Sequence, residues 1–137
     1  STLQTQWDRS ATRHRCTFLG LRRSIEDQNR RTNARVKRLI ELGWVDEIRS
    51  LLAESPPPGR TARQALGYSQ LIDFVQDKIT LEDATETIKI ATRQFAKSQR
   101  TWFKRFLATC WFDVGPDESV TDVADRMCEQ CKPLRPR

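Results

Sequence analysis

The segment ITLEDATETIKIATRQFAKSQRTWF, residues 79–103, carries the longest helical pattern in the sequence and sets the expected fold. Thr80, followed three residues later by Asp83, resembles a capping box, which predicts a helix from here to about Phe106. Each residue turns an α-helix by about 100°, so regularly spaced apolar side chains share one face. That face consists of Leu81, Ala84, Ile88, Ala91, Phe95, Trp102 and Phe106, with Gln99 as the polar interruption. We expect it to lie in the core, Phe95 and Trp102 included.

Basic side chains occupy nearly the opposite side of this helix. They are spaced four, four, three and four residues apart, and no acidic residue interrupts the row: Lys89, Arg93, Lys97, Arg100 and Lys104. A solvated surface explains such a row, and so does a track that faces phosphates. Periodicity alone favours the solvated surface, and both interpretations stay open.

Composition points to one globular domain with a lean toward polyanions. The chain has 137 residues, with 24 Lys and Arg against 18 Asp and Glu, a formal net charge of +6. No run approaches the roughly 18 apolar residues of a transmembrane helix, so we expect no membrane partner. The polar N-terminus lacks the apolar core of a signal peptide, and the four cysteines are unevenly spaced. We therefore expect a cytoplasmic protein.

The remaining patterns predict a mainly α-helical fold with about five helices and two short strands. Gly43 favours the end of one helix, the SPPPG segment 55–59 ends the next because proline lacks an amide donor, and Thr61 can cap a third. The expected helices are 25–42, 45–52, 61–75, 80–106 and 118–130, and the expected strands are 16–21 and 110–114.

Several kinds of active site find little support. None of the five glycines is followed by lysine, so the chain has no phosphate-binding loop of its own. Cys128 and Cys131 form half of a zinc site that His14 and Cys16 could in principle complete, but free thiols are the favoured interpretation. The acidic pairs 46–47 and 82–83 are interpreted as helix N-terminal charges. We expect no metal and no cofactor to be bound by this chain.

The segment ARQALGYSQL, residues 62–71, contains a glycine within a helical pattern. Gly67 would cost such a helix about 1 kcal/mol relative to alanine, so it indicates close approach of another backbone or a ligand. Tyr68 supplies a stacking face and a hydroxyl. Packing between helices explains the same residues equally well, and the two interpretations stay open.

Four segments together resemble a known family. ARQALGY at 62–68 and ITLEDATETIKIATRQFAKSQRTWF at 79–103, preceded by RTNARV at 31–36 and GWVDEI at 43–48, resemble the C-terminal part of tRNA dimethylallyltransferases, also called tRNA isopentenyltransferases. The resemblance covers residues 1–113, and residues 114–137 form an extension of unknown function. Since the chain opens without methionine and in the middle of this pattern, we expect it to be a piece of a longer protein.

The resemblance implies transfer of a dimethylallyl group from dimethylallyl pyrophosphate to N6 of the adenosine next to the anticodon, on its 3′ side. It implies Mg²⁺ in the full enzyme, and a phosphate loop and catalytic aspartate in the N-terminal half, outside this sequence. We therefore expect no catalytic residue here and no activity from this chain alone. The two short strands would join the P-loop-type α/β sheet of the full enzyme. In this chain alone they could pair, exchange between molecules or stay frayed, so we expect self-association.

The resemblance also assigns candidate site residues. Residues for the substrate channel or pyrophosphate are Arg35, Arg93, Lys97 and Gln99. Residues for the tRNA anticodon stem-loop are Gln64, Ala65, Leu66, Gly67, Tyr68, Ser69 and Arg100, although a solvated or helix-pairing role explains Arg100 equally well. Ser98 stands where the family usually has an arginine, and Ser69 and Gln70 stand where a basic residue and an acid are common.

Two other functions remain as alternatives. The chain could be a stand-alone basic helical module that binds structured RNA without catalysis, or a protein-interaction module whose basic row is a solvated surface.

Overall fold

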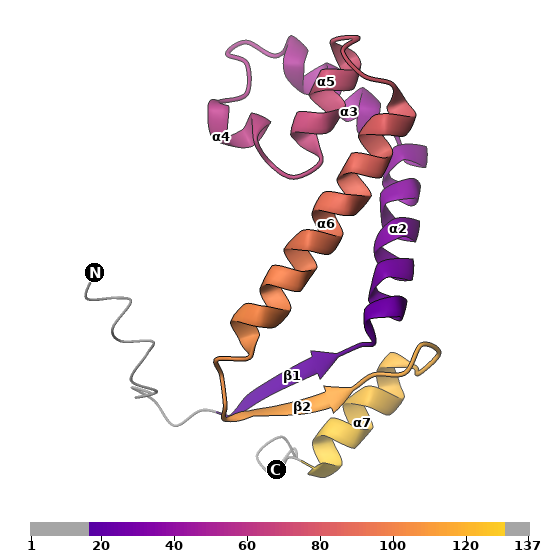
Figure 1. Ribbon diagram of the computed structural model, residues 1–137, viewed down its shortest axis with the longest axis vertical. Coiled ribbons are helices and arrows are strands. Elements are labelled where there is room, and N and C mark those ends of the chain that lie inside the picture. The colour runs from indigo at the N-terminus through magenta and orange to yellow at the C-terminus, as the bar shows by residue number, and fades with distance from the viewer. Residues whose placement is uncertain (1–16, 131–137) are drawn as a thin grey trace, which may run out of the picture. The chain divides into compact units, whose positions relative to one another are not determined.

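The computed structural model describes residues 17–130, which form six helices and one pair of strands (Figure 1). In chain order these elements are β1 (Phe18–Arg22), α2 (Ile25–Glu41), α3 (Trp44–Ala53), α4 (Arg60–Arg63), α5 (Tyr68–Val75), α6 (Leu81–Phe103), β2 (Thr109–Asp113) and α7 (Val120–Gln130). The predicted mainly helical class with two short strands is confirmed.

The chain divides into two compact units. The helical unit comprises residues 28–100, and the strand unit comprises, among the described residues, 17–27 and 101–130. The boundary expected after residue 113 stays a prediction. The expectations for His14, Cys16 and Cys131 fall outside the described residues.

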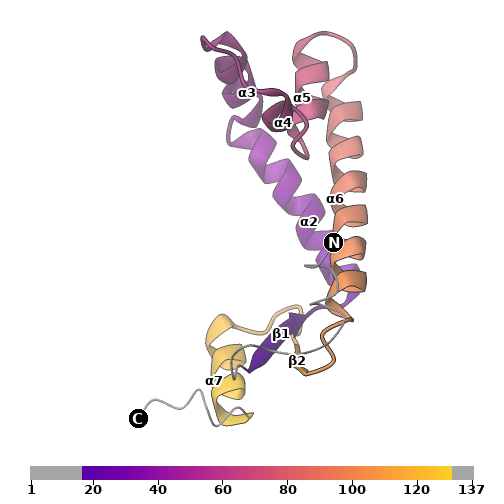
Figure 2. The ribbon, with the colours of Figure 1, turned by 90° about the vertical axis from the view of Figure 1, so that its left-hand side faces the viewer.

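The helical unit has an apolar core to which four helices contribute. The buried side chains are Val36 from α2, Ile48 from α3, Leu71 from α5, and Ala84 and Ile88 from α6. Figure 2 shows α3, α4 and α5 gathered around the C-terminal end of α2 and the N-terminal end of α6. Full burial of one large aliphatic side chain stabilises a fold by about 1.5–3 kcal/mol, so this cluster is the main source of the unit's stability.

Three helices begin at a serine or threonine cap. A backbone N–H donates to the cap hydroxyl three residues earlier, at 3.1 Å in each case: Asp27 to Ser24, Asp83 to Thr80, and Asp122 to Ser119. Such a bond satisfies one of the amides that the first helical turn leaves unpaired. The helix start predicted at Thr80 is confirmed.

The third predicted helix, 61–75, is interrupted. α4 ends at Arg63 and α5 begins at Tyr68, with turns between them. Gly67 has a backbone φ of 91°, a left-handed value that a right-handed helix cannot accommodate and that side chains with a Cβ rarely adopt. The expectation that Gly67 lies within a helix is therefore wrong, because its backbone ends the pattern instead of continuing it.

α6 buries its predicted apolar face only in its N-terminal half. It ends at Phe103, three residues before the predicted end. Ala84 and Ile88 are fully buried, but Phe95 is 57% exposed and Trp102 is 45% exposed. The expectation that Phe95 and Trp102 lie in the core is wrong.

The reason for Phe95 lies in how α6 meets α2 within the helical unit. Beyond Ile88, the covered side of α6 includes Ala96, which is buried, and the half-buried Arg93 and Arg100. Both arginines bond to side chains of α2. The partner helix thus covers a side of α6 different from the one that carries Phe95.

The strand unit contains a two-stranded parallel sheet. β1 and β2 pair with each other, with Phe18 opposite Thr109 and Arg22 opposite Asp113. A bidentate ion pair joins the last two residues, with nitrogen–oxygen distances of 2.6 and 2.7 Å. Within the described residues no third strand joins this sheet, so the outer edge of each strand keeps unpaired backbone groups.

α7 is fastened to the end of β2 by one arginine. Arg126 pairs with Glu118 at 2.6 Å, donates to the carbonyl of Asp113 at 2.8 Å, and lies 6.0 Å from the ring centroid of Phe112. Phe112, with Val123 of α7, belongs to the small buried core of this unit. Polar contacts therefore supplement a core of few side chains.

No helix in the part of the chain between residues 17 and 130 has both the length and the apolar character needed to cross a membrane.

Candidate nucleic-acid interface

The loop between α4 and α5, residues 64–69, contains all but one of the residues predicted to contact tRNA. Its turns are closed by backbone bonds from Ala65 to Ala62 at 3.1 Å and from Tyr68 to Ala65 at 3.0 Å. Gln64, Ala65 and Leu66 are exposed, whereas Gly67 is buried. The loop thus presents three side chains to solvent above an anchored glycine.

The glycine is anchored against a side chain of α3. The ring of Trp44 lies where a Cβ on Gly67 would stand, so no larger residue fits without movement of the ring or the loop. Trp44 also meets the ring of Tyr68 edge to face, with centroids 6.2 Å apart and an angle of 74° between the planes. The close approach inferred from Gly67 is therefore made by an aromatic ring of a neighbouring helix.

The hydroxyl of Tyr68 is used within the protein. It donates to Oε1 of Glu47 at 2.5 Å, and this bond, followed by partial desolvation, raises the pKa of Tyr68 above its ordinary value. Glu47 lies in the first turn of α3, as predicted for the acidic pair 46–47.

Gln70 closes the loop from the C-terminal side. Its Oε1 accepts from the N–H of Gly67 at 3.0 Å and from the hydroxyl of Ser69 at 3.0 Å. Two polar groups of the loop are therefore already engaged by one side chain. Sequence reasoning marked Gln70 only as a departure from the family pattern.

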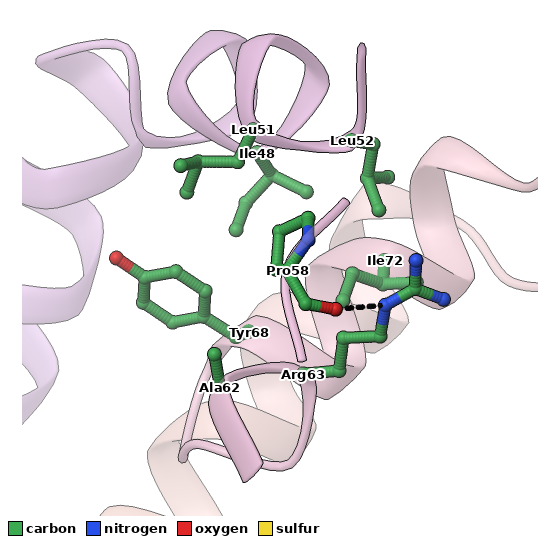
Figure 3. A pocket seen from close by; sticks show the side chains of 8 residues that line it. All are labelled: Ile48, Leu51, Leu52, Pro58, Ala62, Arg63, Tyr68 and Ile72. Carbon is green, nitrogen blue, oxygen red and sulfur yellow. Dashed lines mark hydrogen bonds between the residues drawn. The ribbon is translucent and has the colours of Figure 1, made fainter. Parts of the chain in front are cut away.

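A small apolar pocket lies beneath the loop (Figure 3). Its volume is about 80 Å³, well below the roughly 300–1,000 Å³ typical of ligand sites. Arg63 donates from Nε to the carbonyl of Pro58 at 2.9 Å at its edge. The lining residues are Ile48, Leu51, Leu52, Pro58, Ala62, Arg63, Tyr68 and Ile72. We interpret the pocket as imperfect packing under Tyr68.

A second group of candidate residues lies on the helix pair α2 and α6. Arg93 donates to Oδ1 of Asn33 at 2.8 Å, and Arg100 donates to Oε1 of Gln28. Both partners are amide oxygens, which carry no charge, so these bonds orient each guanidinium without neutralising it. For Arg100, this is the helix-pairing contact that the sequence left open.

The other basic and polar candidates are exposed. Arg35 lies on α2, and Lys97 and Gln99 lie on α6. Lys97 follows Arg93 by four residues and shares its side of the helix, whereas Gln99 is turned about 200° from Lys97. Helix geometry therefore groups Arg93 with Lys97 and separates Gln99 from them.

The basic row is also weaker at its beginning than its spacing suggests. Lys89 pairs with Glu86 at 2.6 Å on the same helix. Glu86 is part of the sequence pattern, but the row was drawn along one side and its neighbours were left out.

Arg100 is remote from the loop within the helical unit. α5 and α6 meet at Leu71 and Ala84, and Arg100 follows Ala84 by 16 positions on one continuous helix, about 24 Å along the axis. The structure therefore does not bring Arg100 together with residues 64–69.

Four residues of this interface were missed by sequence reasoning, and each lies in or beside a quoted motif. Trp44 and Glu47 lie in GWVDEI, Asn33 lies in RTNARV, and Gln70 follows ARQALGYS directly. The motifs marked the right segments, but only the fold shows which side chains meet.

Comparisons with known proteins agree on a family of transferases. Residues 1–106 match the family model described as IPP transferase. A tRNA dimethylallyltransferase of Halothermothrix orenii is 39% identical over 102 residues, which cover 74% of this chain and 31% of that protein. One from Symbiobacterium thermophilum is 36% identical over 131 residues, covering 93% of this chain and 41% of that protein.

Solved structures give the same result. A tRNA delta(2)-isopentenylpyrophosphate transferase from Staphylococcus epidermidis matches with a TM-score of 0.72 and 30% identity, over 82% of this chain and 37% of its own. The full-length tRNA isopentenylpyrophosphate transferase from Bacillus halodurans matches with a TM-score of 0.71 and 29% identity, over 80% and 36%.

The chain belongs to the tRNA dimethylallyltransferase family, which confirms the resemblance read from its motifs. It spans 31% to 41% of the length of these curated relatives.

Proposed function

We propose that this chain is part of a tRNA-modifying prenyltransferase and supplies contacts to the tRNA anticodon stem-loop and to the substrate channel. The observation that carries the proposal is the family match over residues 1–106. Because the substrate is tRNA, we place the enzyme in the cytoplasm.

In the reaction proposed for the whole enzyme, N6 of the adenosine 3′ to the anticodon attacks the allylic carbon of dimethylallyl pyrophosphate. The lone pair of N6 forms the new N–C bond, while the C–O bond breaks and its electrons leave with pyrophosphate. A proton of N6 passes to a base in the remaining length of the enzyme. We propose that the phosphate loop and the catalytic aspartate also belong to that remaining length, so this chain alone is inactive.

Magnesium, when bound, would stabilise the negative charge that builds up on the leaving pyrophosphate. Among residues 17–130, no group of three or more His, Cys, Asp or Glu side chains is arranged to hold a metal ion. We therefore assign the ion to residues outside this part of the chain.

The basic helix pair has a clear role in such a reaction. An adenine stacked in a loop must be flipped out before it can react, and the distorted backbone then needs cationic support. Arg93 is held by a neutral amide at 2.8 Å, so its orientation is fixed while its charge stays available for a phosphate. We assign Arg93, Lys97 and Arg35 to phosphate or channel contacts, and give Gln99 a separate contact on another side of α6.

A salt series tests the binding function. Binding of the chain to an anticodon stem-loop RNA is titrated at several salt concentrations, and we expect the logarithm of affinity to fall by about 0.7–0.9 per phosphate contact for each tenfold rise in salt. Weak binding that ignores salt would favour the protein-interaction module. Equally tight binding to any structured RNA would favour the stand-alone RNA-binding module.

A paired substitution tests the residues. Arg93→Ala with Lys97→Ala should reduce the salt slope by about one to two contacts and weaken RNA binding. The matched control is Lys78→Ala, which removes one charge from an exposed ion pair with Asp73 and should leave the slope unchanged. Unchanged binding in the double variant would remove Arg93 and Lys97 from the site.

The strand unit supports a further part of the proposal, self-association of the isolated chain. Phe18, Trp102 and Phe103 are more than one-third exposed, beside a sheet whose edges are open. Exposed aromatic residues and free strand edges are templates for association. Sedimentation over a concentration series should show dimers at high concentration, and monomers at every concentration would contradict this.

A further inference from the structure

Two side chains of α3 fix the shape of loop 64–69. Trp44 fills the space above Gly67, and Glu47 accepts the hydroxyl proton of Tyr68 at 2.5 Å. All four residues belong to the helical unit. Neither Trp44 nor Glu47 is among the residues assigned above to RNA or substrate.

We propose that Trp44 and Glu47 are positioning residues that hold loop 64–69 in the conformation that contacts tRNA. This inference rests on the proposed function of the loop. It concerns how the loop is prepared for RNA and assigns no direct RNA contact to α3.

The case for Trp44 begins with the backbone of Gly67. Its φ of 91° is accessible to glycine without the steric cost that a Cβ would add. A loop free to sample other conformations would be under no pressure to keep this one. The ring of Trp44 packs against the glycine in this conformation, so movement of the loop away from it would lose that contact. The tryptophan thereby selects one loop shape from the several open to glycine.

The case for Glu47 rests on its charge. A carboxylate repels phosphates, so an acid beside an RNA-contact loop works against the binding it adjoins. The bond to Tyr68 gives this acid a compensating role, because a hydrogen bond to a charged acceptor is stronger than one between neutral groups. The raised pKa of Tyr68 is consistent with the same bond.

The pairing also limits what Tyr68 offers to RNA. Its single O–H donor is directed to Glu47, so it is not available to a base or a phosphate. Tyr68 then acts on RNA through the position of its ring and of the loop. Loss of its hydroxyl should therefore act through Glu47.

A double-substitution cycle tests this pair. Glu47→Ala and Tyr68→Phe are each expected to weaken binding of the chain to an anticodon stem-loop RNA by about fivefold, the factor for one net hydrogen bond. The double variant should be no weaker than either single variant, because both remove the same interaction. Glu47→Gln keeps an acceptor oxygen without the charge and should bind within about twofold of the parent chain.

The matched control for Glu47 is Asp46, its neighbour in the first turn of α3. Asp46 pairs with Arg49 at 2.8 Å and is exposed. Asp46→Ala removes the same charge without touching the loop, so it should leave binding unchanged or slightly tighter. Glu47→Ala that binds RNA more tightly, as Asp46→Ala does, would show that Glu47 acts only by repulsion and would overturn the proposal.

Amide hydrogen exchange provides a readout that needs no RNA. Trp44→Ala should increase exchange at Gly67, Tyr68 and Ser69 by about tenfold while the amides of α6 stay protected, and Trp44→Phe should restore much of the protection. Equal loss of protection in α6 would show a general structural role and overturn positioning by Trp44.

The outcomes separate this inference from the function on which it rests. A parent chain without salt-dependent RNA binding overturns both. A parent chain that binds RNA, with Glu47→Ala and Tyr68→Phe unchanged or additive, overturns the positioning inference and leaves the proposed function standing.

Discussion

The two units of the chain are stabilised in different ways. The helical unit buries one or two apolar side chains from each of four helices in a single cluster. The strand unit buries Phe112, Val114 and Val123, but leaves Trp102 and Phe103 nearly half exposed. It adds ion pairs at Arg22 and Arg126. Apolar burial thus specifies the helical unit, whereas the strand unit depends more on polar contacts.

The largest expected effect is in the core of the helical unit. Ile88→Ala removes a fully buried side chain and should lower the free energy of unfolding by about 2–5 kcal/mol. Ile90→Ala, two residues along the same helix, removes a side chain that is 47% exposed and should cost under about 1 kcal/mol. Denaturant unfolding followed by circular dichroism measures both. Equal losses would show that the cluster does not dominate this unit.

The second effect concerns the loop. Gly67→Ala adds a Cβ at a positive φ and against Trp44, so we expect a loss of about 1–3 kcal/mol. Gly59→Ala is the matched control, since a Cβ there meets no atom within 4 Å and its φ is −63°. Its effect should stay within about 0.5 kcal/mol. The same unfolding experiment compares them, and a Gly67 variant as stable as the parent would contradict the strain.

The third effect probes the polar contacts of the strand unit. Arg126→Ala removes the pair with Glu118, the bond to the carbonyl of Asp113 and the contact with Phe112. We expect a loss of about 1–2 kcal/mol, seen as faster amide exchange in β2. Arg49→Ala, which breaks an exposed pair within α3, should cost under about 1 kcal/mol. Unchanged exchange in β2 would show that α7 does not secure this strand.

The smallest effects are those of pH, and they should divide between the units. The bond to Glu47 raises the pKa of Tyr68, so its contribution is complete below the ordinary tyrosine value of about 10 and is lost as pH rises through the raised value. The bond to Arg22 lowers the pKa of Asp113. That contribution is complete above the ordinary value of about 4 and is lost as pH falls through the lowered value.

Exchange measured across pH tests this division. Alkaline loss of protection should appear in loop 64–69 and vanish in Tyr68→Phe, while acid loss should appear in β1 and β2 and diminish in Asp113→Asn. Losses in the opposite units would break the assignment.

The fold class was within reach of the sequence because long periodic segments determine helices. Thr80 and its apolar spacing placed α6 correctly at its start, and the apolar runs located both strands to within two residues. Phe95 was misplaced because periodicity records apolar positions and not the partner that covers them. α2 contacts α6 through Ala96 and two arginines instead.

The candidate site was predicted as segments and not as contacts. The motif at 62–68 located the loop, but Trp44 is more than 20 residues away in sequence and no local pattern ties its ring to Gly67. Likewise, the row of basic residues showed charge at regular spacing, but it could not reveal that Arg93 would find an amide oxygen on α2. Side chains that meet through the fold are invisible to periodicity.

The parallel pairing of β1 and β2 has a consequence for the order of folding. Arg22 and Asp113 are paired although they lie 91 residues apart in the chain, and closing a loop of that length costs about 4 kcal/mol of length-dependent chain entropy. The helical contacts between these residues have much shorter loops, so they form first and shorten the path that remains. We expect the strands to be the last elements to assemble on the ribosome-released chain and the first to separate when it is pulled or heated.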